Sequence, residues 1–327
     1  MRRHNLLKVV GLGALAVVLC VLPFRVGGYN VGILTILFIN IIMVVSFRLI
    51  VTMGNFSLAH VVLMGAGAYT SALLTREVGW PFWAALPMGG LVAALVALLM
   101  SYPLVRMKGF AFFIGSYAAG EAIRLSWLKL RYPFGGASGI IKIPHPDSIS
   151  VPGLPTIDFA NPISYYFLAL VVTGVCVFLM YRVDRSRLAE NFRAIYSQDI
   201  LASCVGINIT RYKTIAFVIG SFFAGIAGVL LAHFNGTIDP YLFAFTPMMF
   251  ILIWVVVGGT HTFIGPIIGV TLFTGVEERL RVLAEWRPLF YGIVLIVVLL
   301  FLPGGFESLP EKIRPLARRL RSRLGGE

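Results

Sequence analysis

Few residues in the apolar stretches of this sequence are of a type that does chemistry. Arg48, Glu121 and Arg124 lie within or at the end of such stretches, where an ionisable group is a candidate for function because burying it is costly. Glu121 and Arg124 are three residues apart, so on a helix they either pair with each other or line a pathway. Arg48 is near the end of its stretch and is expected to extend toward water. His60 suits a hydrogen bond within the structure better than a bound ligand.

Sequence motifs of common catalytic and metal sites are missing from the chain. It contains no GxxxxGK[ST], HExxH or GxSxG, the signatures of phosphate-binding loops, zinc proteases and serine hydrolases. Its five histidines are too far apart in sequence to argue for a metal site. We therefore expect no catalytic residue, no cofactor and no metal, and energy must come from a partner or an ion gradient. We expect His233 at a membrane interface, and Glu277 and Glu278 in water.

The composition indicates an integral membrane protein. Of its 327 residues, 58% are hydrophobic and 13% are charged, and the mean hydropathy is +0.90, whereas a soluble domain is about half apolar and about a quarter charged. The net charge of +13 does not indicate nucleic-acid binding, because Lys and Arg gather on the cytoplasmic side of membrane helices. The basic clusters that we expect on that face lie in residues 2–8, 182–213 and 312–323. The three scattered cysteines indicate no disulfide framework.

Apolar runs of about 20 residues predict membrane-spanning helices. The first seven such runs are residues 6–22 (ended by Pro23), 31–51, 57–74, 82–102, 109–127, 163–181 and 214–234. The run 57–74 carries the small residues Gly65, Gly67, Ala68 and Ser71. Small residues let helices approach closely in lipid, so we expect this helix at the centre of the bundle.

A break interrupts the apolar sequence near the C-terminus. The run 248–257 meets GGTHTFIGP at residues 258–266, and apolar runs at 267–276 and 289–302 follow. Two short spans around the break bring the total to about ten and place both termini in the cytoplasm, as the charge bias requires. We therefore expect an all-α polytopic helix bundle. One membrane domain would occupy residues 1–310, followed by a basic cytoplasmic tail at 311–327.

The basic stretch 182–213 predicts two short amphipathic helices. Leu188, Phe192 and Ile195 form one apolar stripe at helical spacing. We expect a second helix to begin after Ser197 as its N-cap, with Asp199 in its first turn, and to end at Gly206. Such a helical knob at the cytoplasmic face suits the docking of a soluble partner, although the pattern also fits an ordinary solvated loop.

The polar stretch 128–161 is rich in proline and glycine and lies outside the membrane by alternation of sides. It predicts a shaped external loop rather than a spanning helix. Its candidate functional residues are Gly135, Gly136 and Gly139.

Several stretches together resemble the permease subunits of branched-chain amino-acid ABC importers, of the LivM type. SLAHVVLMGAGAYTSALL at 57–74 is similar to the family's SLGHAAFFGIGAYTAALL, and GGASG at 135–139 resembles its GGSDG. The matches run in family order over nearly the whole chain. Further similar stretches are residues 106–124, 192–208, 216–233, 255–270 and the FLPGG near the end.

The resemblance implies a half-channel of the large-bundle (BtuC-like) importer type, in a bacterial or archaeal cytoplasmic membrane. It also implies a second, LivH-like permease, two ATPase subunits and an external substrate-binding protein as partners. The transported solute would be a branched-chain amino acid or a similar small polar molecule. The residues that match the family's cytoplasmic stretch, and so would couple to the ATPase, are Arg193, Ala194, Ile195, Ile200, Ala202, Gly206 and Asn208. Candidate pathway residues are Ser57, His60, Tyr69 and Glu121.

The chain departs from the family pattern at several positions. Ala189-Glu190 stands where the family has Gly-Arg, and Tyr196-Ser197 stands where it has Arg-Glu. The acidic residue of the external glycine motif is Ser138 here. These changes suggest an ATPase with a co-adjusted groove, or weaker coupling, and leave urea, amides or aromatic acids open as substrates.

Two other functions remain to be weighed. A self-contained secondary transporter would need charged ion-coupling residues deep in discontinuous helices, and this chain offers few. A scaffold protein would use the knob only for assembly. If the knob couples to an ATPase, Gly206→Val or Ile195→Asp should abolish transport while the protein still inserts into the membrane.

Overall fold

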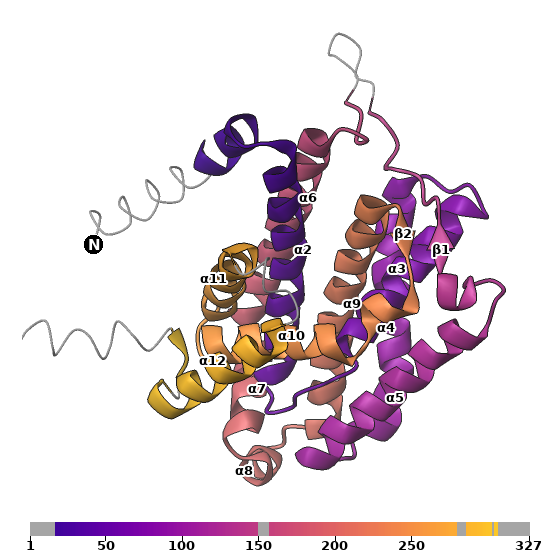
Figure 1. The fold of residues 1–327 in the computed structure, drawn as a ribbon. Coiled ribbons are helices and arrows are strands. Elements are labelled where there is room, and N and C mark those ends of the chain that lie inside the picture. Colours follow the sequence, from indigo (N-terminus) through magenta and orange to yellow (C-terminus); the bar gives the residue numbers. More distant parts are fainter. Residues whose placement is uncertain (1–16, 150–156, 280–285, 303, 307–327) are drawn as a thin grey trace, which may run out of the picture.

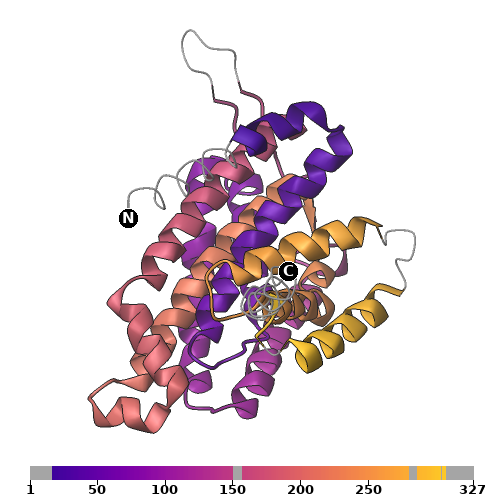
Figure 2. The same cartoon turned by 90° about the vertical axis from the view of Figure 1, so that its left-hand side faces the viewer.

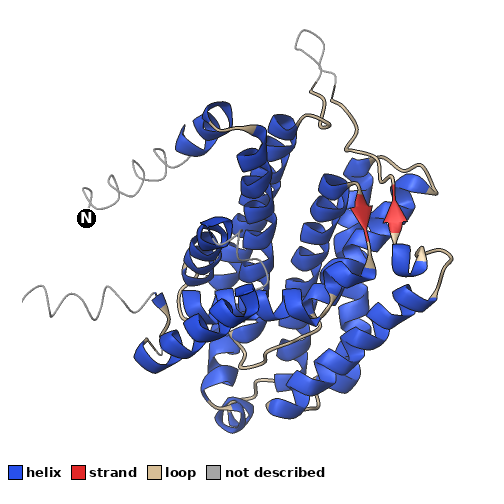
Figure 3. Ribbon diagram, in the orientation of Figure 1, coloured by secondary structure: helices blue, strands red, loops and turns tan. Residues whose placement is uncertain are grey.

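The computed structural model describes residues 17–149, 157–279, 286–302 and 304–306, which form a helical bundle with two short strands (Figure 3). Four of the described helices are long and apolar enough to cross a membrane. They are α2 (Gly28–Val51), α4 (Phe82–Leu104), α6 (Pro162–Asp184) and α9 (Ile209–Asn235). The second, fourth, sixth and seventh predicted spans are thereby confirmed as helices. The first part of the first predicted span and the tail at 311–327 lie outside the described residues.

The centre of the bundle is α9, which packs against α2, α4 and α3 (His60–Arg76) (Figure 1). Glycines allow this contact. A Cβ on Gly67 would lie 2.3 Å from the carbonyl oxygen of Gly225, and one on Gly228 would lie 1.9 Å from that of Met64. The backbones of α3 and α9 therefore touch, as the small residues of the 57–74 run predict.

The helix at residues 17–25 corrects the prediction that Pro23 ends the first span. It continues to Arg25, and the Val26 amide still donates to the Leu22 carbonyl at 3.2 Å. Proline removes only its own N–H and obstructs the carbonyl four residues earlier, so a last turn can follow it. α5 (Phe110–Lys129) lies at the edge of the bundle against α3 and α4.

The break near the C-terminus separates two short helices, as predicted. They are α10 (Phe245–Gly258) and α11 (Gly265–Arg279), which pack against each other and against α2. A Cβ on Gly269 would lie 2.1 Å from the carbonyl oxygen of Trp254, so this contact also requires glycine. α12 (Arg287–Phe301) follows and contacts α10.

Short elements lie at the two ends of the bundle (Figures 1 and 2). At one end, β1 (Ile140–Ile141) pairs antiparallel with β2 (Thr237–Ile238), between the turns η1 (Gly136–Ser138) and η2 (Pro240–Phe243). At the other end, the helices α7 (Arg187–Ser197) and α8 (Asp199–Cys204) project from the bundle. We call α7 and α8 the knob.

Candidate functional site

The knob is fixed to the bundle by one side of α7. Ala189, Phe192 and Ile195 are buried, and the first two pack in a cluster with Leu49 of α2 and Ala216 of α9. Leu188 is partly buried against the same cluster. The predicted apolar stripe is confirmed, and it fastens the knob to the ends of two central helices.

The second knob helix has the predicted C-terminal cap but lacks the predicted N-terminal cap. The Gly206 amide donates to the Ser203 carbonyl and the Ile207 amide donates to the Ala202 carbonyl, with Gly206 at φ +86°. This is the Schellman arrangement, in which a left-handed residue satisfies the last carbonyls of a helix. Ser197 is not the N-cap: it is the last residue of α7, because the chain first turns into extended backbone at Gln198, where no side-chain cap forms.

The knob and the residue that follows α8 expose several large apolar side chains among polar ones. Four of these apolar side chains are more than half exposed. They are Tyr196 (56% exposed), Ile200 (74%), Leu201 (61%) and Val205 (76%). We call them the apolar cap. Three of them, all except Ile200, are missed by the sequence reasoning, although they are the apolar knob residues left over once the inward stripe is assigned.

The structure divides the predicted coupling residues into two groups. Arg193, Ala194, Ile200 and Gly206 are exposed, whereas Ile195 and Ala202 are buried at 1% and 4% exposure. Asn208 accepts a hydrogen bond from the Arg211 amide at 3.0 Å and so caps α9. The last three therefore build the knob and its connection to α9 rather than its outer surface.

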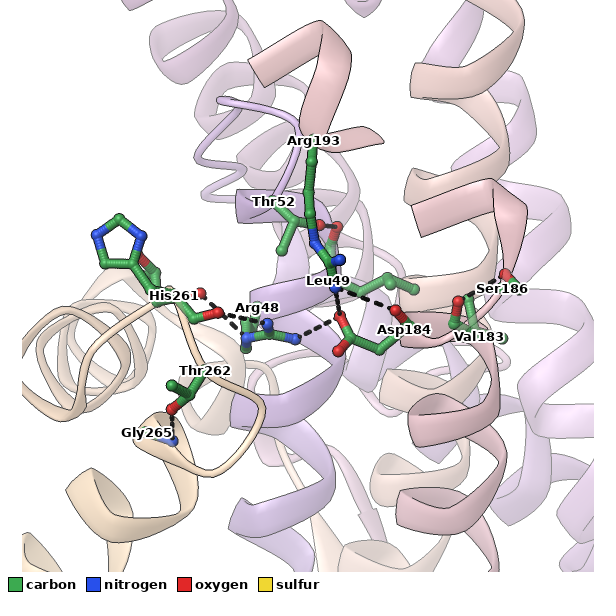
Figure 4. Close-up of polar contacts among 11 residues, drawn as sticks. Arg48, Leu49, Thr52, Val183, Asp184, Ser186, Arg193, His261, Thr262 and Gly265 are labelled. Atoms are coloured by element: carbon green, nitrogen blue, oxygen red, sulfur yellow. Dashed lines mark hydrogen bonds and ion pairs between the residues drawn. The ribbon is translucent and has the colours of Figure 1, made fainter. Parts of the chain in front are cut away.

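Arg48 corrects the expectation that its side chain extends toward water. It is 2% exposed, and its Nη1 lies 3.0 Å from Asp184 Oδ1. Its Nε donates to the Thr260 carbonyl at 3.1 Å and its Nη2 to the His261 carbonyl at 3.3 Å (Figure 4). The reason is that the connection between α10 and α11 folds over the end of α2 and covers the guanidinium.

Arg193 of the knob reaches the same carboxylate. Its Nη2 lies 3.3 Å from Asp184 Oδ1 and 3.1 Å from the Asp184 carbonyl oxygen (Figure 4). We call Arg48, Asp184 and Arg193 the clasp. An arginine inside an apolar run, Arg48, was the one sequence signal for the clasp. Its partner Asp184 lies 136 residues away and could not be identified from the sequence. A cavity of about 90 Å³ borders both arginines and the residues Thr52, Thr260 and His261.

The predicted external glycines form a tight turn. Gly135, Gly136 and Gly139 have φ values of +81°, +62° and +65°. A Cβ on Gly139 would lie 1.9 Å from the carbonyl oxygen of Ile238, so glycine is needed where this turn meets the loop after α9. The turn shapes the end of the bundle opposite the knob.

Comparison with known proteins decides the family. The profile described as a branched-chain amino acid transport system permease component matches residues 29–302. The chain belongs to this permease family. It is 30% identical over 312 residues to the permease protein LivM of Salmonella typhimurium, covering 90% of this chain and 73% of LivM. It is 36% identical over 148 residues to LivH of the same organism (44% and 46%), and 25% identical over 249 residues to the guanosine permease NupQ of Bacillus subtilis (73% and 76%). No solved structure matches it.

Three of the four candidate pathway residues of the permease are packed inside the bundle. Ser57 and His60 are fully buried and Tyr69 is 1% exposed. His60 Nε2 lies 2.9 Å from Ser46 Oγ, which confirms the expected structural hydrogen bond. Within the described residues, Ser57 Oγ and the Tyr69 hydroxyl have no hydrogen-bond partner. Glu121 is paired with Arg124, with an Nε–Oε2 distance of 2.8 Å, which confirms the pairing alternative.

Three further polar residues of the permease are held by hydrogen bonds. His233, expected at a membrane interface, lies in the last turn of α9 and is fully buried within the protein, with Nε2 2.7 Å from Ser71 Oγ and Nδ1 2.6 Å from the Pro144 carbonyl oxygen, because the segment around Pro144 covers the end of α9. Glu277 and Glu278, expected in water, are partly exposed. They accept hydrogen bonds from the hydroxyls of Tyr291 and Tyr29.

In the described part of the permease, no group of three or more His, Cys, Asp or Glu side chains could hold a metal ion. The family is one of transport permeases, so this multi-pass membrane protein is a transport component and not an enzyme.

Proposed function

We propose that this permease is one membrane half of an ATP-driven importer and that the knob is its docking site for the ATPase. The observation that carries the proposal is the apolar cap. Four large apolar side chains project from a structure that is rigidly packed at its base, at the end of the bundle where basic residues gather. Exposed apolar surface of this kind marks a protein interface.

We propose the composition of the complete transporter from the likeness to LivM and LivH. It would contain a LivH-like permease as the second half, two ATPase subunits and an external binding protein. The substrate class we propose is a branched-chain amino acid or a similar small polar solute; the likeness to a guanosine permease widens that class to other polar molecules.

The membrane arrangement belongs to the same proposal. The helix at 17–25, the helices α2 to α6 and α9 to α12 would make about ten crossings in a large-bundle (BtuC-like) architecture. Both termini and the knob would then face the cytoplasm of a bacterium or archaeon, because the Lys- and Arg-rich segments share that side. The turn at 135–139 would face the external binding protein.

The first experiment is to purify the tagged chain in mild detergent from its native host. We expect an ATPase and a second permease to be recovered with it. Recovery of the chain alone, together with solute transport by the chain alone in liposomes, would contradict the proposal and favour a secondary transporter.

A single substitution in the apolar cap tests the docking surface. Ile200→Asp places a charge at the most outward part of α8 and should weaken ATPase recovery by about 30-fold, the effect of losing roughly 2 kcal/mol at an interface hot spot. Tyr241→Asp is the matched control, because Tyr241 is 59% exposed in η2, at the opposite end of the bundle. Equal ATPase recovery with both variants would exclude the cap as the docking surface.

A further inference from the structure

We propose that the clasp is the joint through which movement of the knob reaches the connection between α10 and α11, with Asp184 as the central positioning residue. This inference rests on the proposed function, because it concerns how an ATPase bound to the knob would act on the membrane helices.

The clasp joins four segments: the consecutive helices α6 and α7, with α2 and the α10–α11 connection, which are distant from them in sequence. Arg193 comes from α7, Asp184 is the last residue of α6, and Arg48 lies in the last turn of α2. Arg48 then donates to the carbonyl oxygens of Thr260 and His261 in the α10–α11 connection. A continuous path of ion pairs and hydrogen bonds, with N–O distances between 3.0 and 3.3 Å, therefore runs from the knob to the break (Figure 4).

The connection at the far end of this path has a backbone that depends on glycine and on the Arg48 side chain. Gly259 has φ +107°, a conformation that only glycine adopts readily. Phe263 lies over the Arg48 guanidinium at 5.7 Å and contacts the ring of Tyr181 in α6 at 5.4 Å. Broken backbone of this kind is held in place by side-chain donors, and here Arg48 supplies them. Moving Arg48 would therefore move the break.

The two arginines hold Asp184 unequally. The Arg48 side chain is 2% exposed, whereas that of Arg193 is 53% exposed. Buried ion pairs with one partner removed are strongly destabilised, but pairs open to water are weak. The Arg193–Asp184 contact is therefore the half that can open and close as the knob moves, and the Arg48–Asp184 contact is the permanent half.

The test uses the complete importer, reconstituted in liposomes, with transport and ATP hydrolysis measured together. Arg193→Ala removes the knob's contact with Asp184 and leaves Arg48 paired. We expect solute moved per ATP to fall by about tenfold, within the usual range of coupling between sites, while ATPase recovery with the complex is unchanged. Arg193→Lys, which keeps the charge, should restore part of the ratio. Arg187→Ala is the matched control, because Arg187 is an exposed arginine of the same helix.

Two results would overturn the inference. An unchanged ratio of transport to ATP hydrolysis in Arg193→Ala would show that the contact transmits nothing. Loss of the ATPase from the Arg193→Ala complex would instead make Arg193 a docking residue. If the wild-type chain recruited no ATPase at all, the proposed function itself would be refuted. That outcome is distinct from both results for Arg193→Ala.

A second variant tests whether Arg193 acts through Asp184. Asp184→Asn removes the shared charge, and adding Arg193→Ala to it should lower the transport ratio no further, because residues of one network are not additive. Additive losses would contradict the role of Asp184. Asp184→Glu keeps the charge. Normal folding and membrane insertion of this variant would show that position 184 tolerates a change of side chain.

Discussion

Gly206 ends the knob in a backbone conformation that other residues adopt with difficulty. Its φ is +86°, and a Cβ there would meet no atom within 4 Å, so any cost of substitution is conformational and not steric. We expect Gly206→Val to destabilise the end of α8 by about 1–2 kcal/mol and to impair transport.

The matched control is Gly206→Asn. Asparagine enters the left-handed region more readily than valine, so transport should be largely retained. Uptake can be measured for both variants at equal amounts of membrane-inserted protein. Equal loss of uptake in Gly206→Asn and Gly206→Val would mean that residue 206 matters for a reason other than its positive φ.

Ile195 is less useful as a test than the sequence suggests. Its side chain is 1% exposed and belongs to the buried side of α7. Ile195→Asp would bury an unpaired carboxylate, so loss of transport would report a damaged knob and not a lost contact. Substitutions in the apolar cap avoid this ambiguity.

At the scale of helices, the contact between α3 and α9 sets the packing of the bundle. Gly228→Ala would put a methyl group 1.9 Å from the Met64 carbonyl oxygen, where backbone must move to admit it. We expect a loss of about 1–3 kcal/mol, the usual cost of overpacking, seen as a lower Tm in detergent.

Gly174→Ala is the control for the Gly228 variant. Gly174 lies in α6, and a methyl group added to it would meet no atom within 4 Å, while alanine favours helix over glycine by about 1 kcal/mol. Its Tm should stay the same or rise. Equal Tm values for both variants would contradict the tight α3–α9 contact.

The helices that could be predicted from the sequence are those marked by local signals. The runs at 31–51 and 82–102 are long and apolar, and GGTHTFIGP marks the break by its glycines and proline. The extent of helix past Pro23 was not predictable, because it depends on one turn that proline still permits. The ends of α6 and α9 reach into the basic stretch 182–213, since charged residues continue a helix as readily as apolar ones.

The candidate site was predictable only where the signal is local. The stripe of α7 and the cap at Gly206 follow from spacing within a few residues. Burial of Arg48 and His233 does not, because their partners Asp184 and Pro144 are far away in sequence. The outward side of the knob could be found only after its inward side was known.

At the scale of the whole molecule, the cysteines give a test of orientation. Cys204 is exposed on the knob and Cys176 is buried. In a Cys20→Ser background, a membrane-impermeant maleimide should label Cys204 only after the membrane is opened. A cysteine introduced as Ser138→Cys, in the external turn, should be labelled in intact cells. Labelling of Cys204 from outside would reverse the proposed topology.

Arg48 also has a consequence for how the protein is made. The chain emerges from the ribosome with this arginine at the end of α2, 136 residues before Asp184 and 212 before Thr260. α10 and α11, with 14 and 15 residues, are each about 21–23 Å long, shorter than the roughly 30 Å of hydrocarbon. Until the connection between them has been synthesised, the Arg48 guanidinium lacks two of its acceptors. Its full set of partners therefore exists only after most of the chain has been made.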